Sequence, residues 1–331
     1  MSRLGLGIAA AGGVLGATWY LSQPGKPKNS AFVFVKPHAV TDKTNKLVAE
    51  RLKEKGLKIT GEGTLASEVI DEKKLIDQHY YAIASKATIL KPSELNIPKE
   101  KFKSTFGLDW DSVLASGKAV NALDACKEFG CSADELASAW GASKKAGKLV
   151  KFGGGFYCGL VSMKGKELYV FNGFFMTMRS AFTAPGKSIH WYTVEWEPSA
   201  LSWEDFRGKV LGPTDPAEAP KDSLRGEILE KWQDLGLPGK PNTGDNGVHA
   251  SASPFEAMAE RMNWLAMKCT QDSYCKALVK AGITEKNITS WSVDPQVKIE
   301  AGGKKGSLFD ALEDMDATPC LEKAKALQAM Q

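Results

Sequence analysis

The sequence has little net charge for its length. Its 331 residues include 43 Lys and Arg against 39 Asp and Glu, which gives a formal net charge of +4. A surplus this small is not the electrostatic footprint of a nucleic-acid-binding protein, so we expect no nucleic-acid partner. The hydrophobic fraction of 43% is typical of a globular chain with one large domain or two ordinary ones.

Cysteine is also scarce, and its spacing excludes a zinc finger. The chain has six cysteines, and no closely spaced pair has a matching second pair. An even number permits disulfides in an oxidising compartment, and reduced thiols are an equally good interpretation. We therefore expect no metal site made by the protein alone. The six residues are Cys126, Cys131, Cys158, Cys269, Cys275 and Cys320.

A Walker-type phosphate loop is absent as well. The glycines at 153–155 are neither followed by Lys and Ser or Thr nor by a helix start. These are the features that a nucleotide-binding loop of that type requires. We interpret the three glycines as a bend in a strand.

Only residues 4–21 are apolar and uncharged over a length that fits a short membrane span. Their small residues, such as Gly12 and Gly16, permit close approach of another helix. A secretory signal peptide and a buried helix are alternatives, but glycine is frequent here and only Arg3 precedes the run. We predict a membrane anchor at residues 1–22 and a linker at 23–30.

The anchor resembles, in composition, the N-terminal anchors of mitochondrial inner-membrane proteins. We therefore expect the mitochondrial inner membrane as the location, with another organelle membrane as the alternative. The small-residue face also suggests contact with other subunits of a membrane complex.

Periodicity of apolar residues predicts an α+β fold. Strands alternate with helices, and no long run of parallel strands is indicated. A helix is expected to begin after Ser253, with Pro254 as its first residue and Glu256 completing a capping box. The predicted strands are 31–35, 57–65, 149–160, 168–171 and 189–196. The other predicted helices are 46–55, 71–81, 109–116, 132–142, 202–206 and one from about 308.

His249 lies just before that capped helix, in a predicted loop. An imidazole at such a junction can act as a nucleophile as well as a base. Taken alone, it is better interpreted as a surface histidine. His38, His79 and His190 have no motif around them and are interpreted as structural or exposed, and Trp191 and Trp196 as core residues of a strand.

Three motifs in order change that interpretation. A strand ends in Val35-Lys36-Pro37, Thr214 precedes Arg225-Gly226, and Asn246 precedes His249 and Glu260. In order and spacing these motifs resemble the nucleoside diphosphate kinase family. The resemblance covers residues 31–84 and 173–265, and it makes 85–172 an insertion and 266–331 a C-terminal extension.

The resemblance implies a ferredoxin-like core, a four-stranded antiparallel sheet with helices on one face. It implies that His249 is phosphorylated, that Glu260 orients its ring and that Ser251 supports Glu260. The function implied is transfer of the γ-phosphate of a nucleoside triphosphate to a nucleoside diphosphate. Glu260 could otherwise be a solvated helix residue, and the motif spacing is the reason to prefer a role in catalysis.

The resemblance also implies a nucleotide site. Lys36 and Arg225 would bind phosphate oxygens, whereas the alternative is that both are exposed charges. Magnesium would bridge the phosphates, held mainly by nucleotide and water. The remaining implied contacts are Thr214 near the β-phosphate, Asn246 at the ribose, Phe174 on the base and Tyr80 beside the histidine.

The chain departs from the family pattern near the histidine. Ala250 and Ala252 replace a glycine and an aspartate, and the family's second phosphate-binding arginine falls at Gly208. Arg207 is one residue early, and a one-residue bulge would restore its register. The insertion joins the helices that clamp the nucleotide and could cover or reshape the site. The alternative function is a catalytically weak, structural subunit of a membrane complex with a kinase fold.

Overall fold

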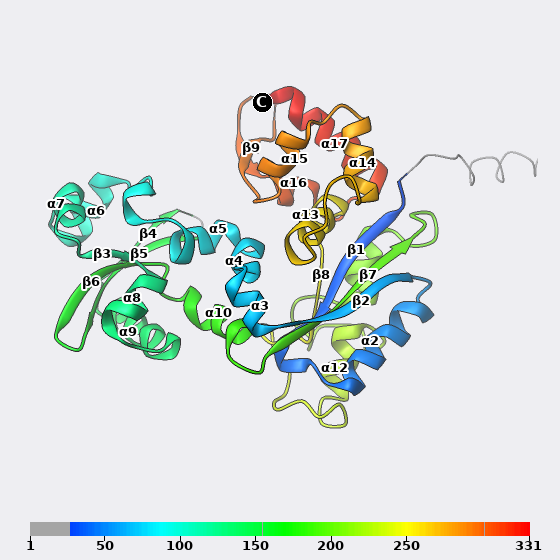
Figure 1. Cartoon of the computed structure of the whole chain (residues 1–331), viewed down its shortest axis with the longest axis horizontal. Helices are drawn as coiled ribbons and strands as arrows, with labels where there is room; N and C mark the ends of the chain where they lie inside the picture. The colour runs from blue at the N-terminus through cyan, green and yellow to red at the C-terminus, as the bar shows by residue number, and fades with distance from the viewer. Residues whose placement is uncertain (1–26, 154, 301) are drawn as a thin grey trace, which may run out of the picture.

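The computed structural model describes residues 27–153, 155–300 and 302–331 (Figure 1). The predicted anchor and most of the predicted linker fall in residues 1–26 and lie outside the described residues. Among the helices that are described, none has the length and apolar character needed to cross a membrane. Over these described residues the chain is mixed α/β, with two separate four-stranded sheets and a two-stranded one.

The first sheet consists of β1 (Asn29–Val35), β2 (Lys58–Ala66), β7 (Ser188–Trp196) and β8 (Val248–Ala250). Their order is β2-β7-β1-β8, and every neighbouring pair is antiparallel. This confirms the predicted four-stranded antiparallel sheet. The strand β8 was not predicted: His249 lies on an edge strand opposite Phe34 of β1, and not in a loop. A strand of three residues has no detectable period of its own, so only its pairing with β1 defines it.

Helices cover both faces of this sheet, and not one face as expected. Side chains of β1 alternate, so Val33 and Val35 share a core with α2 (Asp42–Glu54) and α12 (Leu224–Glu230). Phe32 and Phe34 point the other way, into a second core. Elements on that side are α3 (Ser67–Glu72), α4 (Leu75–His79), α10 (Phe175–Thr183) and α13 (Pro254–Trp264).

The helix predicted over 71–81 is broken. Lys74 has φ 52°, a left-handed conformation that ends α3 and starts α4. A further helix, α5 (Tyr81–Ala84), follows directly after α4, and Ser85–Ile89 forms a π-helical turn. The break turns His79, the last residue of α4, toward the phenyl ring of Phe34 in the sheet.

Residues 119–171 form the second sheet, on the left in Figure 1. Its strands β3 (Ala119–Asn121), β4 (Leu149–Gly153), β5 (Phe156–Met163) and β6 (Lys166–Phe171) lie in the order β3-β6-β5-β4. The single strand predicted over 149–160 is wrong: Gly153 of β4 pairs with Phe156 of β5, so the chain reverses direction between two antiparallel strands and does not bend within one. The helices of this unit are α6 (Lys99–Phe106), α7 (Trp110–Ala115), α8 (Ala122–Phe129) and α9 (Ala133–Lys145).

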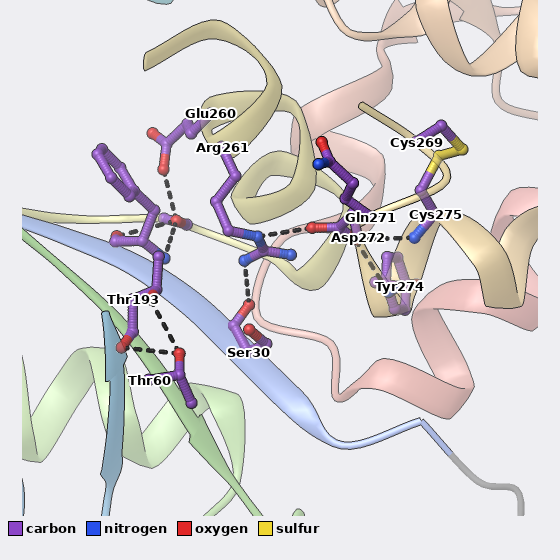
Figure 2. Close-up of polar contacts among 12 residues, drawn as sticks. Ser30, Thr60, Thr193, Glu260, Arg261, Cys269, Gln271, Asp272, Tyr274 and Cys275 are labelled. Atoms are coloured by element: carbon purple, nitrogen blue, oxygen red, sulfur yellow. Dashed lines mark hydrogen bonds and ion pairs between the residues drawn. A yellow bond between two sulfur atoms is a disulfide. The ribbon is translucent and has the colours of Figure 1, made fainter. Parts of the chain in front are cut away.

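Residues 266–331 form a helical unit that packs on α13. Phe255 and Met258 of α13 belong to the same buried cluster as its helices. Figure 2 shows Arg261 of α13 between the carbonyl oxygen of Ser30, at 3.0 Å, and the carboxylate of Asp272, at 2.7 Å. The elements are α14 (Ser273–Lys280), α15 (Glu285–Trp291), β9 (Gln296–Lys298), β10 (Lys305–Ser307), α16 (Leu308–Leu312) and α17 (Ala317–Met330).

One disulfide, Cys269–Cys275, lies at the start of this unit, so the cysteines divide between the two interpretations left open by the sequence. The other four cysteines are free thiols. Asp272 lies between the two bridged residues and caps α14 by accepting hydrogen bonds from the backbone N–H of Tyr274 and Cys275. Helix α14 is thereby tied both to the disulfide and to Arg261.

Candidate active site

The strand β8 and the helix α13 bring His249 and Glu260 together. Ser253 is the N-cap of α13 and accepts a hydrogen bond from the N–H of Glu256, and Pro254 occupies the first helical position, as predicted. The predicted capping box is only half formed, because among the described residues the carboxylate of Glu256 accepts no hydrogen bond from the N–H of Ser253. The helix then packs along β1, so that its second turn returns to the level of His249. Glu260 is buried there, with only 5% of its side chain exposed.

We expect the hydrogen bond at this cap to stabilise the folded chain. Replacing Ser253 by alanine should lower the free energy of unfolding by about 1 kcal/mol, because the buried N–H of Glu256 loses its acceptor. Urea unfolding of the purified chain measures the change. Ser290→Ala, at an exposed helical position of α15, is the matched control and should shift stability by less than about 0.5 kcal/mol. Equal effects of the two substitutions would contradict a specific role for the cap.

Hydrogen bonds orient the ring of His249. Its Nε2 lies 2.6 Å from Oε1 of Glu260, and the hydroxyl of Ser251 donates to Oε2 of the same carboxylate at 2.5 Å. The backbone N–H of Phe32 donates to Ser251 Oγ at 3.0 Å, which fixes the hydroxyl in turn. An ionised Glu260 holds the ring proton on Nε2. Among the described residues no hydrogen bond reaches Nδ1, so that nitrogen keeps its lone pair.

His79 is a second imidazole at this carboxylate. It was expected to be structural or exposed; its side chain is 5% exposed, and its Nδ1 lies 3.4 Å from Oε1 of Glu260. The indole N–H of Trp264 donates to the same Nδ1 at 3.3 Å. His79, His249 and Glu260 have metal-ligand spacing. Their facing atoms are engaged in hydrogen bonds with one another, Ser251 and Trp264, so we assign no metal to them.

Burial and nearby cations keep both imidazoles neutral. Burial is the main cause that lowers the pKa of His249 well below its usual value, and Lys36, Arg225 and Arg207 lower it further. Burial, with His249 next in size, lowers the pKa of His79 to about 3. A neutral imidazole is the form that can attack an electrophile.

A cavity of about 450 Å³ opens beside His249. Arg225 lies in its wall, where three of the guanidinium's five N–H groups donate to the carbonyl oxygens of Gly212 and Val248. Two N–H groups are left for a ligand. The residues that line the cavity are Glu204, Arg207, Gly208, Leu211, Gly212, Pro213, Thr214, Arg225, His249, Ala250, Ala252, Glu256, Glu313 and Asp314.

Arg207 enters this cavity through a local change of helix type. Residues Phe206–Leu211 form a π-helix, which follows directly after α11 (Trp203–Asp205). Each hydrogen bond of a π-helix spans one residue more than in an α-helix. The side chains that follow a π-helical turn are therefore rotated about the helix axis. Arg207 is the second residue of this π-helix. The guanidinium donates to Glu313 and Asp314 of the C-terminal unit.

Lys36, Thr214 and Asn246 lie around the same end of β1. The ammonium group of Lys36 donates to the carbonyl oxygen of Gly244 at 3.2 Å, and burial with the neighbouring Arg225 lowers its pKa to about 8. Asn246 is buried and its Nδ2 donates to the carbonyl oxygen of Thr214 at 3.0 Å. Its Oδ1 finds no donor among the described residues. Asn246 lines neither cavity, so the ribose contact implied for it is not seen in this structure.

A second cavity, of about 210 Å³, reaches His249 from the side of Tyr80. Burial, with Glu260 next, raises the pKa of Tyr80 to about 12, so its hydroxyl stays protonated. Glu256 lines both cavities, one helical turn before Glu260, and burial raises its pKa well above its usual value. The sequence motif predicts only a capping role for Glu256. Its spacing of four from Glu260 was the signal that both carboxyl groups share one face of α13.

Two expectations about the surroundings were wrong. Phe174 does not reach either cavity: its ring packs against Trp140 and Tyr157 in the inserted unit. None of the described residues of 85–172 lines either cavity, so the insertion does not cover the site. The C-terminal unit does so instead, with Glu313 and Asp314 at one cavity and Ser292 and Phe309 at the other.

Comparison with known proteins gives weak likenesses only. No model of a protein family and no curated protein matches the chain. A solved nucleoside diphosphate kinase from Encephalitozoon cuniculi is 14% identical with a TM-score of 0.34, over 72% of this chain and 89% of that one. An NDP kinase from Pyrobaculum aerophilum is 17% identical with a TM-score of 0.35, over 74% and 98%.

A third solved structure is the nucleoside-diphosphate kinase from Borrelia burgdorferi with bound vanadate and ADP. It is 14% identical with a TM-score of 0.33, over 74% of this chain and 89% of that one. Scores this low carry no conclusion about activity, and the function must be argued from the chain's own residues.

Proposed function

We propose that this chain is a nucleoside diphosphate kinase that transfers the γ-phosphate of a nucleoside triphosphate through a phosphohistidine at His249. The observation that carries the proposal is the pairing of His249 Nε2 with the buried carboxylate of Glu260. This pairing leaves Nδ1 free beside a cavity that contains Arg225 and Arg207. A neutral, oriented imidazole next to two guanidinium groups is what phosphoryl transfer to histidine requires.

In the first half-reaction, Nδ1 of His249 attacks the γ-phosphorus. The new N–P bond forms as the bond to the bridging oxygen breaks, and the nucleoside diphosphate leaves with the bond's electron pair. Glu260 holds the Nε2 proton throughout and stabilises the positive charge that develops on the ring. In the second half-reaction, a terminal phosphate oxygen of another nucleoside diphosphate takes the group from Nδ1 and restores the neutral histidine.

Cations and hydroxyl groups around the cavity would bind the rest of the nucleotide. Arg225 has two N–H groups to offer to phosphate oxygens, and the positive charge of Lys36 lies close enough to affect both Arg225 and His249. The exposed Thr214 could donate its hydroxyl to the β-phosphate. Asn246, which the resemblance implies at the ribose, is buried and lines neither cavity. Phe174 is excluded as the base-stacking residue by its packing.

Magnesium is the cofactor that such a reaction implies. It would neutralise the negative charge of the phosphate groups. The cavity offers carboxylate oxygens from Glu204, Glu313 and Asp314, and the last two already accept from Arg207. This donor set fits a metal that arrives with the nucleotide and keeps mainly phosphate and water ligands.

Labelling with γ-labelled ATP and magnesium tests the proposal. Residues 27–331, or the full chain in detergent, should acquire label that is stable in base and lost in acid, as a phosphohistidine is. The label should then pass to added GDP. Label that resists acid, or label that GDP does not remove, would contradict the proposed mechanism.

We expect phosphorylation to slow about tenfold for each pH unit below about 7. Burial raises the pKa of Glu260 to about 7, with His79 and Ser251 offsetting part of the rise. A protonated Glu260 no longer accepts the Nε2 proton, so the fraction of correctly oriented His249 falls with pH. Single-turnover labelling rates across this pH range measure the effect, and a flat profile would refute it.

The stability that Glu260 contributes changes with pH in the opposite direction to the phosphorylation rate. Its folded pKa of about 7 lies above the usual 4.5, so the folded chain binds the proton more tightly than the unfolded chain. By linkage, this contribution is present below about 4.5 and is lost as the pH rises through about 7. Comparison of the pH dependence of urea unfolding for the wild type and Glu260→Gln isolates it.

We propose attachment to a membrane through residues 4–21, with the mitochondrial inner membrane as the location. The support is the uncharged, glycine-rich composition of that stretch. Recovery of the full chain in the soluble fraction, without detergent, would contradict it. If labelling fails while ATP still binds, the alternative of a structural subunit with a kinase fold becomes the better interpretation, because the C-terminal unit narrows the cavity.

A further inference from the structure

Two carboxylates of the C-terminal unit, Glu313 and Asp314, line the His249 cavity next to Arg207. Nη1 of Arg207 donates to Oε1 of Glu313 at 2.6 Å and to Oδ1 of Asp314 at 2.7 Å. Both carboxylate side chains are 44% exposed and line the cavity together with His249 and Arg225. The cation best placed to supplement Arg225 is therefore already paired.

The turn that carries these carboxylates is fixed to the core on both sides. Leu312, just before it, is fully buried. The N–H of Asp314 donates to the carbonyl oxygen of Ala252, three residues after His249, at 2.9 Å. Just after it, Asp316 accepts hydrogen bonds from the Asn29 side chain, at 2.7 Å, and from the N–H of Trp203, at 2.8 Å. The pair is held in place, and is not a loose tail.

Glu313 and Asp314 accept from Nη1 of Arg207 and place two negative charges beside its guanidinium, so a phosphate oxygen must compete with them for this cation. Burial disfavours the charged form of Arg207 and acts to lower its pKa. The hydrogen bonds and charges of the two carboxylates outweigh the effect of burial, so the pKa is raised above its usual value. A polyphosphate that enters the cavity also meets two like charges at short range. Both effects lower its affinity for the cavity.

We propose that Glu313 and Asp314 act as a built-in competitor for the phosphate group that Arg207 would bind, so that the C-terminal unit sets the affinity of the cavity for nucleoside triphosphates. The inference rests on the proposed function, because it takes nucleotide phosphates as the ligand. To bind them, Arg207 exchanges its bonds to the carboxylates for bonds to phosphate oxygens. The exposed carboxylates turn outward, while Leu312 and Asp316 hold the turn in place.

Isothermal calorimetry of magnesium ATP binding tests this with the full chain. The double variant Glu313→Gln with Asp314→Asn removes both charges and keeps the shape of both side chains. Asparagine also tolerates the φ of 59° at position 314. We expect its Kd to fall about 10-fold to 100-fold, the range for a hydrogen bond between charged groups. Glu300→Gln with Glu322→Gln removes two charges elsewhere in the same unit and should leave the Kd unchanged.

A third measurement identifies Arg207 as the partner. Adding Arg207→Ala to the double variant should cancel the gain in affinity, because no guanidinium is left to be released. An unchanged Kd in the double variant, or the same gain in the control variant, would overturn the inference. If the wild type takes label at His249 and the double variant binds no tighter, only this inference fails. If no variant binds magnesium ATP, the proposed function fails with it.

Discussion

Purified protein in which alanine replaces His249 is expected to take no acid-labile label from γ-labelled ATP and to transfer none to GDP. His249 is the nucleophile of the proposed mechanism, and no other described imidazole has both an oriented ring and a place in the cationic cavity. His79 lies close by, but its Nδ1 accepts from Trp264 and its side chain is buried away from that cavity. The loss should therefore be complete within detection.

The control for this variant is His190→Ala. His190 lies on β7, where its Nδ1 is hydrogen-bonded to Thr64 on the edge strand β2, and it lines neither cavity. It should label as the wild type does. Full labelling of His249→Ala would contradict the phosphohistidine mechanism. Loss of label in both variants would show that the assay reports on loss of folding and not on the nucleophile. Circular dichroism and thermal melting decide between these outcomes.

Replacing Glu260 by glutamine is expected to lower the phosphorylation rate by about 10²-fold to 10⁴-fold. The substitution keeps the shape of the side chain and removes its charge. An amide can donate to Nε2 of His249, which would move the ring proton to Nδ1 and block the nucleophile. The hydroxyl of Ser251 also loses its charged acceptor. The rate should fall while magnesium ATP binding stays near that of the wild type, since Glu260 does not line the cavity that contains Arg225 and Arg207.

Single-turnover labelling and calorimetry together measure this split between rate and binding. The matched control is Glu230→Gln, an exposed carboxylate at the end of α12. The pH dependence adds a readout that a purely structural role would not change: the inflection near 7 should be absent in Glu260→Gln. A variant that labels at the wild-type rate, with the inflection intact, would show that Glu260 does not orient the ring.

The core sheet could be predicted from the sequence because its strands are long enough to show a pattern. The strand predicted over 31–35 and the strand over 189–196 appear in the structure, slightly extended, as β1 and β7. The start of α13 could also be predicted, since Ser253 and Pro254 act within one helical turn. The strand β8 could not be predicted, because three residues show no alternation of apolar and polar side chains and only their hydrogen bonds to β1 define the strand.

The site divides in the same way. The order and spacing of motifs indicated His249, Glu260, Ser251, Arg225 and Asn246, and the structure brings these residues together around the end of β1. His79, Glu256 and Arg207 were missed or left open, because each reaches the site through a feature of the backbone. These features are the break at Lys74, the shared face of α13 and the π-helix at Phe206–Leu211.

The sequence by itself determined the chemistry on offer: one histidine preceded by an asparagine and followed by a carboxylate, with cations at fixed spacing before it. Local patterns suffice for this, because spacing along a strand or a helix fixes which side chains share a face. Only the tertiary structure decided what surrounds that chemistry. In that structure Phe174 packs against the inserted unit and not at the site. Glu313 and Asp314 contact Arg207, which lies more than a hundred positions before them in the chain. Contacts of that range depend on how whole units dock, and no local pattern in the chain encodes them.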